Sequence, residues 1–175
     1  MPNEETLRVA PKILKYAIGS IDEKITYRPT DANDPFGGFK YGLMALTDSD
    51  WANSVGTRRS HGCYIIMLAG TYIAHRSKAH KSVMLSSAAA GYYEASEVCR
   101  ELIYIRGILE HFYGEPLPPT PMYIDNPACI AMGKMPVFSE RQKNIPIRVC
   151  HLKEFCDEGI VELRHIGTKY QLVVI

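Results

Sequence analysis

The sequence lacks the features of a membrane-bound, secreted or strongly charged protein. In its 175 residues the longest weakly polar stretch, 62–74, is shorter than the roughly 20 residues that a membrane-spanning helix needs. The first residues, MPNEETLR, hold two acids and no apolar core, which is not typical of a signal peptide. Lys and Arg total 20 against 19 Asp and Glu, so binding to nucleic acid would depend on local basic patches. We expect a cytoplasmic or nuclear protein that is neither secreted nor bound to a membrane.

The sequence also has no closely spaced cysteine pair of the C-x-x-C type and only one tryptophan. The five cysteines are an odd number without C-x-x-C spacing, which favours a reducing compartment and free, mostly buried thiols. Cys150, His151 and Cys156 lie close in sequence, but their spacing matches no common zinc pattern, and we interpret them as residues of one helix. Trp51 is the only tryptophan, and we expect it in the core rather than as a platform for base stacking.

The composition is that of an ordinary globular domain, with 46% apolar and 22% charged residues. Residue patterns predict three consecutive strands in the body, followed by strands that alternate with helices. This order favours an α/β fold, a mixed sheet with helices packed on it. Predicted helices cover 6–18, 87–112, 128–134 and 141–157, and predicted strands cover 24–27, 41–47, 63–68, 71–75, 122–125 and 160–165.

Two further patterns define the organisation of the chain. The segment 28–38 is rich in Pro, Asp and Gly, so we separate an N-terminal arm, 1–38, from a body, 39–175. Within the body, apolar residues recur at steps of three and four from Ala95 to Phe112, which predicts a long helix with that stripe in the core. Ser86 or Ser87 would cap its start, and Gly114 would end it.

Two aspartates fall where predicted strands end. Asp48 closes the first strand of the body, and Asp125 closes the fourth. If these strands are neighbours, about 4.8 Å apart, their carboxylates converge at one sheet edge and can share a hard cation such as Mg²⁺. The alternative is that each aspartate starts a turn or caps the next element. Spacing alone leaves both interpretations open.

Several strings together resemble the ribonuclease H domain of copia-type LTR retrotransposon polyproteins. The match runs in the same order over essentially the whole chain, including the arm, which resembles the segment that precedes the domain. The matching strings are TDSDWA at 47–52, RRS at 58–60, LSS at 85–87, DN at 125–126, ACIA at 128–131, and the spaced residues Lys134, Pro136, Val137, Phe138, Arg141, Lys143, Ile145, Ile147 and Arg148.

This resemblance implies a ribonuclease H-like mixed five-stranded sheet flanked by helices. It also implies cleavage of RNA in RNA–DNA hybrids with two Mg²⁺ or Mn²⁺ ions held by acidic residues. Asp48 and Asp125 match two of those acids and become the candidate catalytic and metal-binding residues. The implied partners are an RNA–DNA hybrid or other nucleic acid and the rest of a polyprotein.

The sequence departs from the family at the other two acidic positions. The helix glutamate aligns with Gly91, and a later acid aligns with Val174, one residue before the last, so the final helix is expected to be truncated. Glu94 lies three residues after position 91, about 60° around the helix, and is the nearest substitute. We nevertheless expect Glu94 on the solvated face. Any metal should then bind weakly.

Residues suited to phosphate contact remain. The candidates for nucleic-acid binding are Ser87, Asn126, Arg141, Lys143 and Arg148. Basic residues also gather at 75–81 and 134–153, although each group is equally well explained as a solvated charged face. We therefore expect a weak or inactive ribonuclease H-like domain. The alternatives are a pseudo-nuclease that binds nucleic acid or protein, and a transposon remnant without a selected role.

Overall fold

The computed structural model describes residues 4–27, 42–51, 58–81, 83–84, 86–134 and 147–173. Side chains at 5, 6 and 147–150 are not described. The predicted division between arm and body at residue 38 lies outside these ranges, as do Arg141 and Lys143. None of the helices in the described part of the chain is both long and apolar enough to cross a bilayer.

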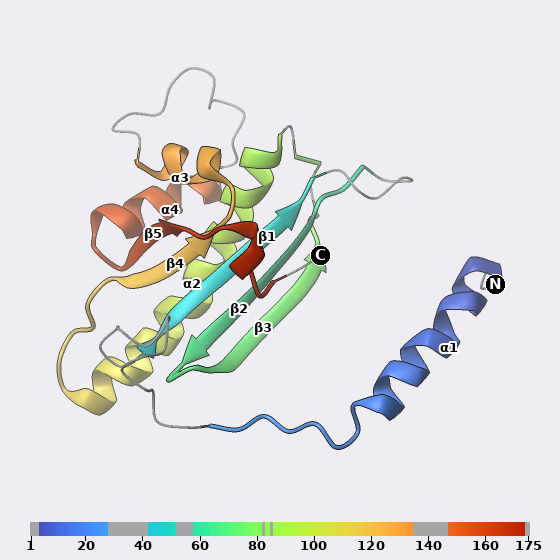
Figure 1. The fold of residues 1–175 in the computed structure, drawn as a ribbon. Helices are drawn as coiled ribbons and strands as arrows, with labels where there is room; N and C mark the ends of the chain where they lie inside the picture. The colour runs from blue at the N-terminus through green and yellow to red at the C-terminus, as the bar shows by residue number, and fades with distance from the viewer. Residues whose placement is uncertain are drawn as a thin grey trace.

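A five-stranded mixed sheet forms the centre of the body (Figure 1). Its strands lie in the order β3-β2-β1-β4-β5, with antiparallel pairing from β1 through β2 to β3 and parallel pairing of β4 with β1 and β5. This arrangement confirms the predicted fold class and the antiparallel start of the body. The strands are β1 (Met44–Asp50), β2 (His61–Leu68), β3 (Thr71–Ala79), β4 (Thr120–Ile124) and β5 (Val161–His165).

The hairpin between β2 and β3 turns at Ala69 and Gly70, between the two predicted strands. Ala69 and Gly70 both have positive φ, 50° and 74°, as the two central residues of a type I′ turn require. Glycine adopts this conformation without a steric penalty, whereas Ala69 does not. The turn pairs Leu68 with Thr71, and an irregularity between Ile66 and Met67 then shifts the register so that Cys63 faces Ser77.

Helix α2 (Ser87–Tyr113) is the longest element, and both of its ends follow the sequence signals. The Ser86 hydroxyl accepts a hydrogen bond from the backbone N–H of Ala89 (3.1 Å). Gly114 adopts the left-handed conformation, with φ of 71°, and its N–H bonds to the Glu110 carbonyl. Between these caps the inner face of α2 supplies fully buried Ala95 and Leu102 to the core.

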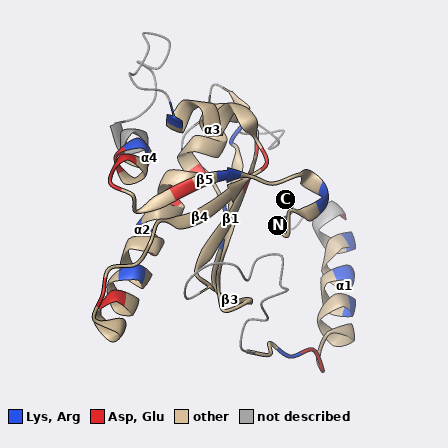
Figure 2. Ribbon diagram, turned by 60° about the vertical axis from the view of Figure 1, so that its left-hand side comes forward, with Lys and Arg blue, Asp and Glu red and all other residues tan. Residues whose placement is uncertain are grey.

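The helices of the body cover one face of the sheet. In Figure 2, α2, α3 (Pro127–Lys134) and α4 (Ile147–Asp157) lie on one side of the strands and α1 (Glu4–Gly19) lies on the other. The larger apolar cluster fills the space under the body helices. A smaller cluster on the opposite face comprises Met44, Leu46, Cys63, Met67, Ile166 and Val173. A 3-10 turn at Thr168–Tyr170 precedes this last segment.

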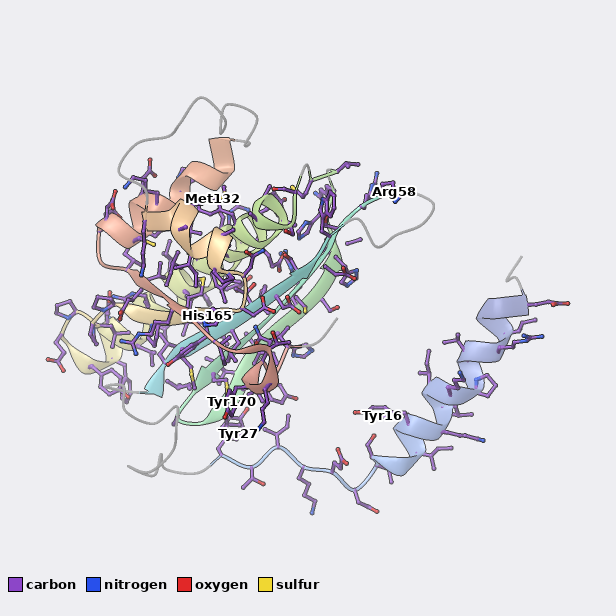
Figure 3. All side chains as sticks on the ribbon, turned by 45° about the horizontal axis from the view of Figure 1, so that its top comes forward. Tyr16, Tyr27, Arg58, Met132, His165 and Tyr170 are labelled. Carbon is purple, nitrogen blue, oxygen red and sulfur yellow. The ribbon has the colours of Figure 1, made fainter. Side chains whose placement is uncertain are left out.

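Helix α1 stands apart from the sheet (Figure 3), although Tyr16 near its end lines a cavity together with Ile65 and Tyr72 of the body. Its apolar residues are exposed by 44% or more: Leu7, Val9, Ile13, Leu14, Tyr16 and Ile18. The residues that follow are held near β3 by a hydrogen bond from the Thr71 hydroxyl to the Thr26 carbonyl (3.0 Å). The predicted strand at 24–27 is wrong, because this segment joins no sheet.

Two aromatic residues differ from prediction. Trp51 is 49% exposed instead of buried, since its indole N–H reaches out to donate to the Met84 carbonyl (2.9 Å). Phe112 is 80% exposed, although its spacing placed it in the core stripe. The stripe is buried from Ala95 to Leu102 and only partly buried at Ile105 and Leu109, so the last turn of α2 leaves the core.

We expect the arm to contribute little to the stability of the body. Leu102→Ala, in the core, should lower the free energy of unfolding by about 2–5 kcal/mol. Leu14→Ala, where the leucine is 62% exposed, should change it by less than about 0.5 kcal/mol. Urea denaturation of both variants makes the comparison. Similar losses in the two would show that α1 is part of the body's cooperative unit.

Candidate active site

The parallel pairing of β1 with β4 brings the two candidate aspartates together. The paired residues run from Ala45 with Met122 to Thr47 with Ile124. Asp48 and Asp125 are the next residue on each strand, so they lie side by side at one edge of the sheet. Both line a cavity of about 270 Å³, whose other walls are Thr47, Ser49, Gly91, Ile124 and Asn126. The expected approach of the two carboxyl groups to within roughly 6 Å stays a prediction.

Asp48 is half-buried and lies close to the charge of Asp125. Burial raises the pKa of its carboxyl group above the usual range, and the charge of Asp125 raises it further. The backbone N–H of Ser49 donates to Asp48 Oδ1 (2.7 Å), which opposes the rise in pKa. The cavity therefore concentrates negative charge, as a cation site requires.

Two of the predicted nucleic-acid contacts lie near this cavity. Asn126 lines it, while its Oδ1 caps α3 by accepting from the backbone N–H groups of Ala128 (3.0 Å) and Cys129 (3.3 Å). Because the cap uses the oxygen, the amide nitrogen remains the group suited to a phosphate. Ser87 is exposed at the start of α2, one helical turn before Gly91 and on the same side of the helix.

Gly91 opens α2 onto the cavity. A Cβ at this position would lie 3.5 Å from Ser49 Oγ and 3.6 Å from Cys129 Sγ, which are ordinary contact distances. A Cβ therefore fits at this position without displacing its neighbours. The glycine leaves the space above the two aspartates without an acidic group from α2.

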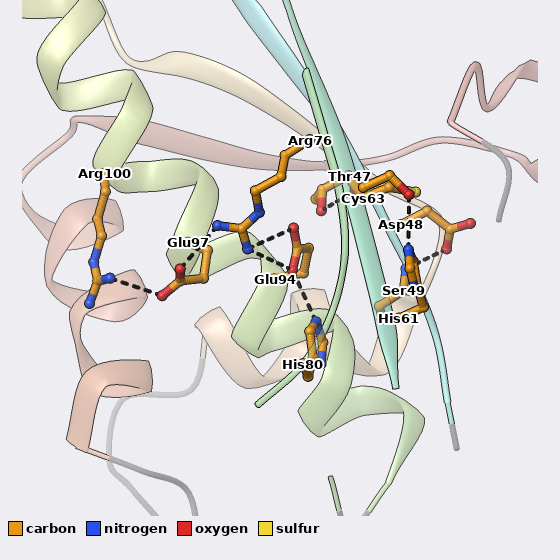
Figure 4. A network of polar contacts seen from close by, with 11 residues as sticks. Thr47, Asp48, Ser49, His61, Cys63, Arg76, His80, Glu94, Glu97 and Arg100 are labelled. Carbon is orange, nitrogen blue, oxygen red and sulfur yellow. Dashed lines mark hydrogen bonds and ion pairs between the residues drawn. The ribbon is translucent and has the colours of Figure 1, made fainter. Parts of the chain in front are cut away.

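Glu94 is not on the solvated face, and that prediction was wrong. It is fully buried, and its carboxylate lies 3.0 Å from His80 Nε2 and 3.5 Å from the Arg76 guanidinium (Figure 4). Arg76 also pairs with Glu97 (3.2 Å), which pairs in turn with Arg100 (3.0 Å). Glu94 is thus bound to basic side chains of β3 and of the segment after it.

The Glu94 carboxylate occupies a niche made by a missing side chain. Gly62 lies beneath it on β2, and a Cβ there would overlap both the Glu94 carboxylate and the His80 ring. Gly62 faces Ser49 across the β1–β2 pair. Two residues of α2 therefore face different parts of the sheet. Gly91 lies over Ser49 and the aspartates, and Glu94 lies over Gly62 and the β2–β3 hairpin.

The four cysteines with described side chains, Cys63, Cys99, Cys129 and Cys156, are free, as expected, and the first three are buried. Cys63 faces Asp48 across the strands. Burial raises the pKa of its thiol to about 12, and Asp48 and Glu94 contribute to the rise. Burial likewise raises the pKa of Cys129, below Gly91, to about 12. These thiols stay protonated at neutral pH, so they are unsuited to act as nucleophiles or metal ligands.

The remaining predicted contacts are only partly described. Arg148 has no described side chain, and position 174 lies beyond the described ranges. Just before it, Gln171 is buried, and its side-chain amide donates to the Thr47 carbonyl (3.1 Å), so the C-terminal segment is tied to β1 beside the aspartates. Of the basic group 75–81, Arg76 belongs to the Glu94 network, while Lys78 and Lys81 are exposed.

The donor set fits one divalent cation better than two. Mg²⁺ commonly takes one or two carboxylates and completes its shell with water and phosphate oxygens. Asp48 and Asp125 supply the two carboxylates that one such ion needs. Among the described residues no group of three or more Asp, Glu, His or Cys is placed to hold a metal.

Known proteins resemble this chain over nearly its whole length. It is 28% identical to the retrovirus-related Pol polyprotein from transposon RE1 of Arabidopsis thaliana, over 98% of this chain and 11% of the relative. It is 27% identical to the corresponding polyprotein from transposon TNT 1-94 of Nicotiana tabacum, over 95% of this chain and 12% of the relative. The chain thus spans about a ninth of these proteins. No protein-family model matches it.

Among solved structures, LC11-RNase H1, isolated from compost, superposes with a TM-score of 0.51. The sequence identity is 12%, and the match covers 74% of this chain and 86% of the other. The likeness confirms the predicted ribonuclease H-like fold. Together with the polyprotein relatives, it confirms the resemblance to a retrotransposon Pol polyprotein that the sequence motifs indicated.

We expect Glu94→Gln to destabilise the protein by about 3 kcal/mol, because it leaves Arg76 and His80 without their buried anion. Glu97→Gln is the matched control. Glu97 is 16% exposed, and its loss should cost about 1 kcal/mol or less. Guanidinium denaturation measures both. Equal, small effects would mean that Glu94 is not the centre of the network.

Asp48→Asn should raise the melting temperature at neutral pH. Since the folded state raises the pKa of Asp48, ionisation of this group costs stability as the pH rises above the unfolded value of about 3.9. The gain should therefore disappear near pH 3, where the carboxyl is protonated in both states. Melting curves from pH 3 to 8 test this. A variant less stable than the parent at pH 7 would contradict it.

Proposed function

We propose that this ribonuclease H-like domain, related to retrotransposon Pol polyproteins, binds nucleic acid at the Asp48–Asp125 edge but cuts RNA–DNA hybrids weakly or not at all. Hydrolysis of this kind uses two divalent cations held by a cluster of carboxylates. The cavity retains two of the acidic groups. The proposal concerns this domain alone, because the chain spans a small part of its relatives.

The observation that carries the proposal is the open position above the two aspartates. Gly91 faces the cavity and offers no ligand, although the surroundings have room for a side chain. A second cation would have to be held by Asp48 and Asp125 alone, against the repulsion between two ions. The residues therefore fit one Mg²⁺ or Mn²⁺, bound weakly.

Glu94 is a poor replacement for the missing acid. Moving its carboxylate to the cavity would break two contacts and leave Arg76 and His80 facing an empty niche. An uncompensated charge at a buried site costs several kcal/mol. A weakly bound cation does not offset that loss, so the network keeps Glu94 in place.

Support for nucleic-acid binding comes from the rim of the cavity. Asn126 lines the cavity, and Ser87 is exposed at the start of α2, one turn before Gly91. Lys78 of β3 and Lys81, which comes after that strand, are also exposed. One cation between the aspartates would offset their charge and allow a phosphate to approach. Binding of this kind depends on shape and phosphate, falls with salt and reads little base sequence.

Gly91→Glu is the direct test. We expect the unmodified chain to bind a labelled RNA–DNA hybrid in fluorescence anisotropy with Mg²⁺ present, and to cleave it at background rate. Gly91→Glu should tighten Mg²⁺ binding about tenfold or more and raise cleavage measurably, because it returns a carboxylate and removes a helix-interior glycine worth about 1 kcal/mol.

Gly91→Gln is the matched control, since it has the same size and helix propensity without the charge. It should improve stability but neither metal affinity nor cleavage. Rapid cleavage by the unmodified chain that is abolished by Asp48→Asn would overturn the proposal. Failure to bind hybrid with or without Mg²⁺ would overturn its binding part.

A further inference from the structure

We propose that the segment 166–173, which we call the C-terminal bracket, sets the spacing between Asp48 and Asp125. Within this bracket, Gln171 is the positioning residue. The bracket begins where β5 ends and includes the 3-10 turn at Thr168–Tyr170. Its effect on a bound cation rests on the function proposed above, whereas its effect on the aspartates of the metal-free protein does not.

Pairing of β1 with β4 stops short of the two aspartates. The last paired residues are Thr47 and Ile124, one residue before each aspartate. Beyond this point β1 continues along β2, while the chain leaves β4 and enters α3 at Pro127. The two carboxylates also repel each other, since the charge of Asp125 raises the pKa of Asp48. Their spacing therefore depends on contacts outside the β1–β4 pair.

The C-terminal bracket holds the peptide group that precedes each aspartate. The Gln171 side-chain amide donates to the Thr47 carbonyl (3.1 Å). The backbone N–H of Ile166 donates to the Ile124 carbonyl (3.1 Å). Each of these carbonyls belongs to the planar peptide group that contains the nitrogen of the following aspartate, so a bond to its oxygen orients the start of that residue. One short segment thus orients both aspartates.

The C-terminal bracket is anchored at both of its ends. Ile166 and Val173 are buried in the smaller apolar cluster, together with Met44 and Leu46 of β1. Between these anchors, the Tyr170 N–H donates to the carbonyl of residue 167 (2.8 Å) and closes the 3-10 turn. Figure 1 shows this dark red segment crossing β1. The two holding contacts are therefore joined by a compact turn rather than by a loose loop.

A second hydrogen bond orients the Gln171 amide. The backbone N–H of Val173 donates to Gln171 Oε1 (3.5 Å), so the amide nitrogen is the atom that faces the Thr47 carbonyl. Gln171 is 7% exposed and Thr47 is 1% exposed, and at such a buried site water does not readily replace a lost donor. This contact can be removed by substitution, whereas the contact of Ile166 is made by the backbone.

The spacing of the aspartates decides how well they share a cation. Mg²⁺ takes oxygen ligands at about 2.0–2.1 Å in near-octahedral geometry and tolerates little deviation from it. Since Gly91 adds no ligand to the cavity, the cation depends on the Asp48–Asp125 pair. Residues that orient metal ligands through hydrogen bonds affect the affinity for the metal as well as the stability of the fold. Gln171 is placed to act in this way.

Gln171→Met tests the proposal, with Val173→Ala as the matched control. Methionine has nearly the same length as glutamine but cannot donate to the Thr47 carbonyl. The control removes packing from the same segment and leaves the Gln171 bond in place. Both variants should melt at lower temperature, Gln171→Met by roughly 3–8 °C. Only Gln171→Met should weaken Mn²⁺ binding, by about tenfold or more, in electron paramagnetic resonance titrations.

A readout without metal separates this proposal from the proposed function. In Gln171→Met, relaxation dispersion of the Asp48 and Asp125 backbone amides should reveal microsecond-to-millisecond motion that is smaller in the unmodified chain and in Val173→Ala. Gln171→Asn, which is too short to reach Thr47, should behave in the same way and serves if the methionine variant does not fold.

Two results would overturn the role of Gln171. The first is an unchanged Mn²⁺ affinity in Gln171→Met, or an equal loss of affinity in Val173→Ala, which would make the Gln171 bond a matter of stability alone. The second is unchanged motion of both aspartate amides in Gln171→Met. If the unmodified chain binds no Mn²⁺, the metal part of the proposed function fails, and the motion of the amides still decides whether the bracket holds the aspartates.

Discussion

The parallel pairing of β1 with β4 is the constraint on which the site depends. It ends at Thr47 and Ile124, and so it forces Asp48 and Asp125 into neighbouring positions whose charges repel. Such a pair is stable only if the sheet beneath it is well buried or if a cation neutralises it. Here the buried residues of β1 and the Gln171 bond to the Thr47 carbonyl hold the edge together.

Helix α2 serves three separate purposes along one length. Its first turns stand over the aspartates at Gly91, its next turn anchors the β2–β3 hairpin through Glu94, and its last turns leave the core with an exposed apolar face. The Glu94 network explains why Glu94 does not supply an acid to the cavity beside Gly91. A carboxylate already required by Arg76 and His80 for stability is not available for a metal.

The sequence predicted the five strands of the sheet, the caps of α2 and the meeting of the two aspartates, because these follow from local periodicity, from turn chemistry and from the motif order. It did not predict the burial of Glu94. Helical geometry gives the angle between positions 91 and 94, but the niche depends on a missing side chain at Gly62 and on cations from another strand, which no local pattern records. The predicted burial of Phe112 was wrong for the same reason. Periodicity shows which face of the helix is apolar, whereas the extent of the sheet decides how much of that face is covered.

The number of metal ions that the chain binds tests the central claim most directly. Mn²⁺ bound per chain can be counted by electron paramagnetic resonance, with and without a hybrid whose RNA strand cannot be cut. With two carboxylates and no substitute for position 91, one weakly held ion is expected, and it should be lost in Asp48→Asn. Two ions per chain in the presence of hybrid, at micromolar affinity, would contradict the account and point to an intact catalytic centre.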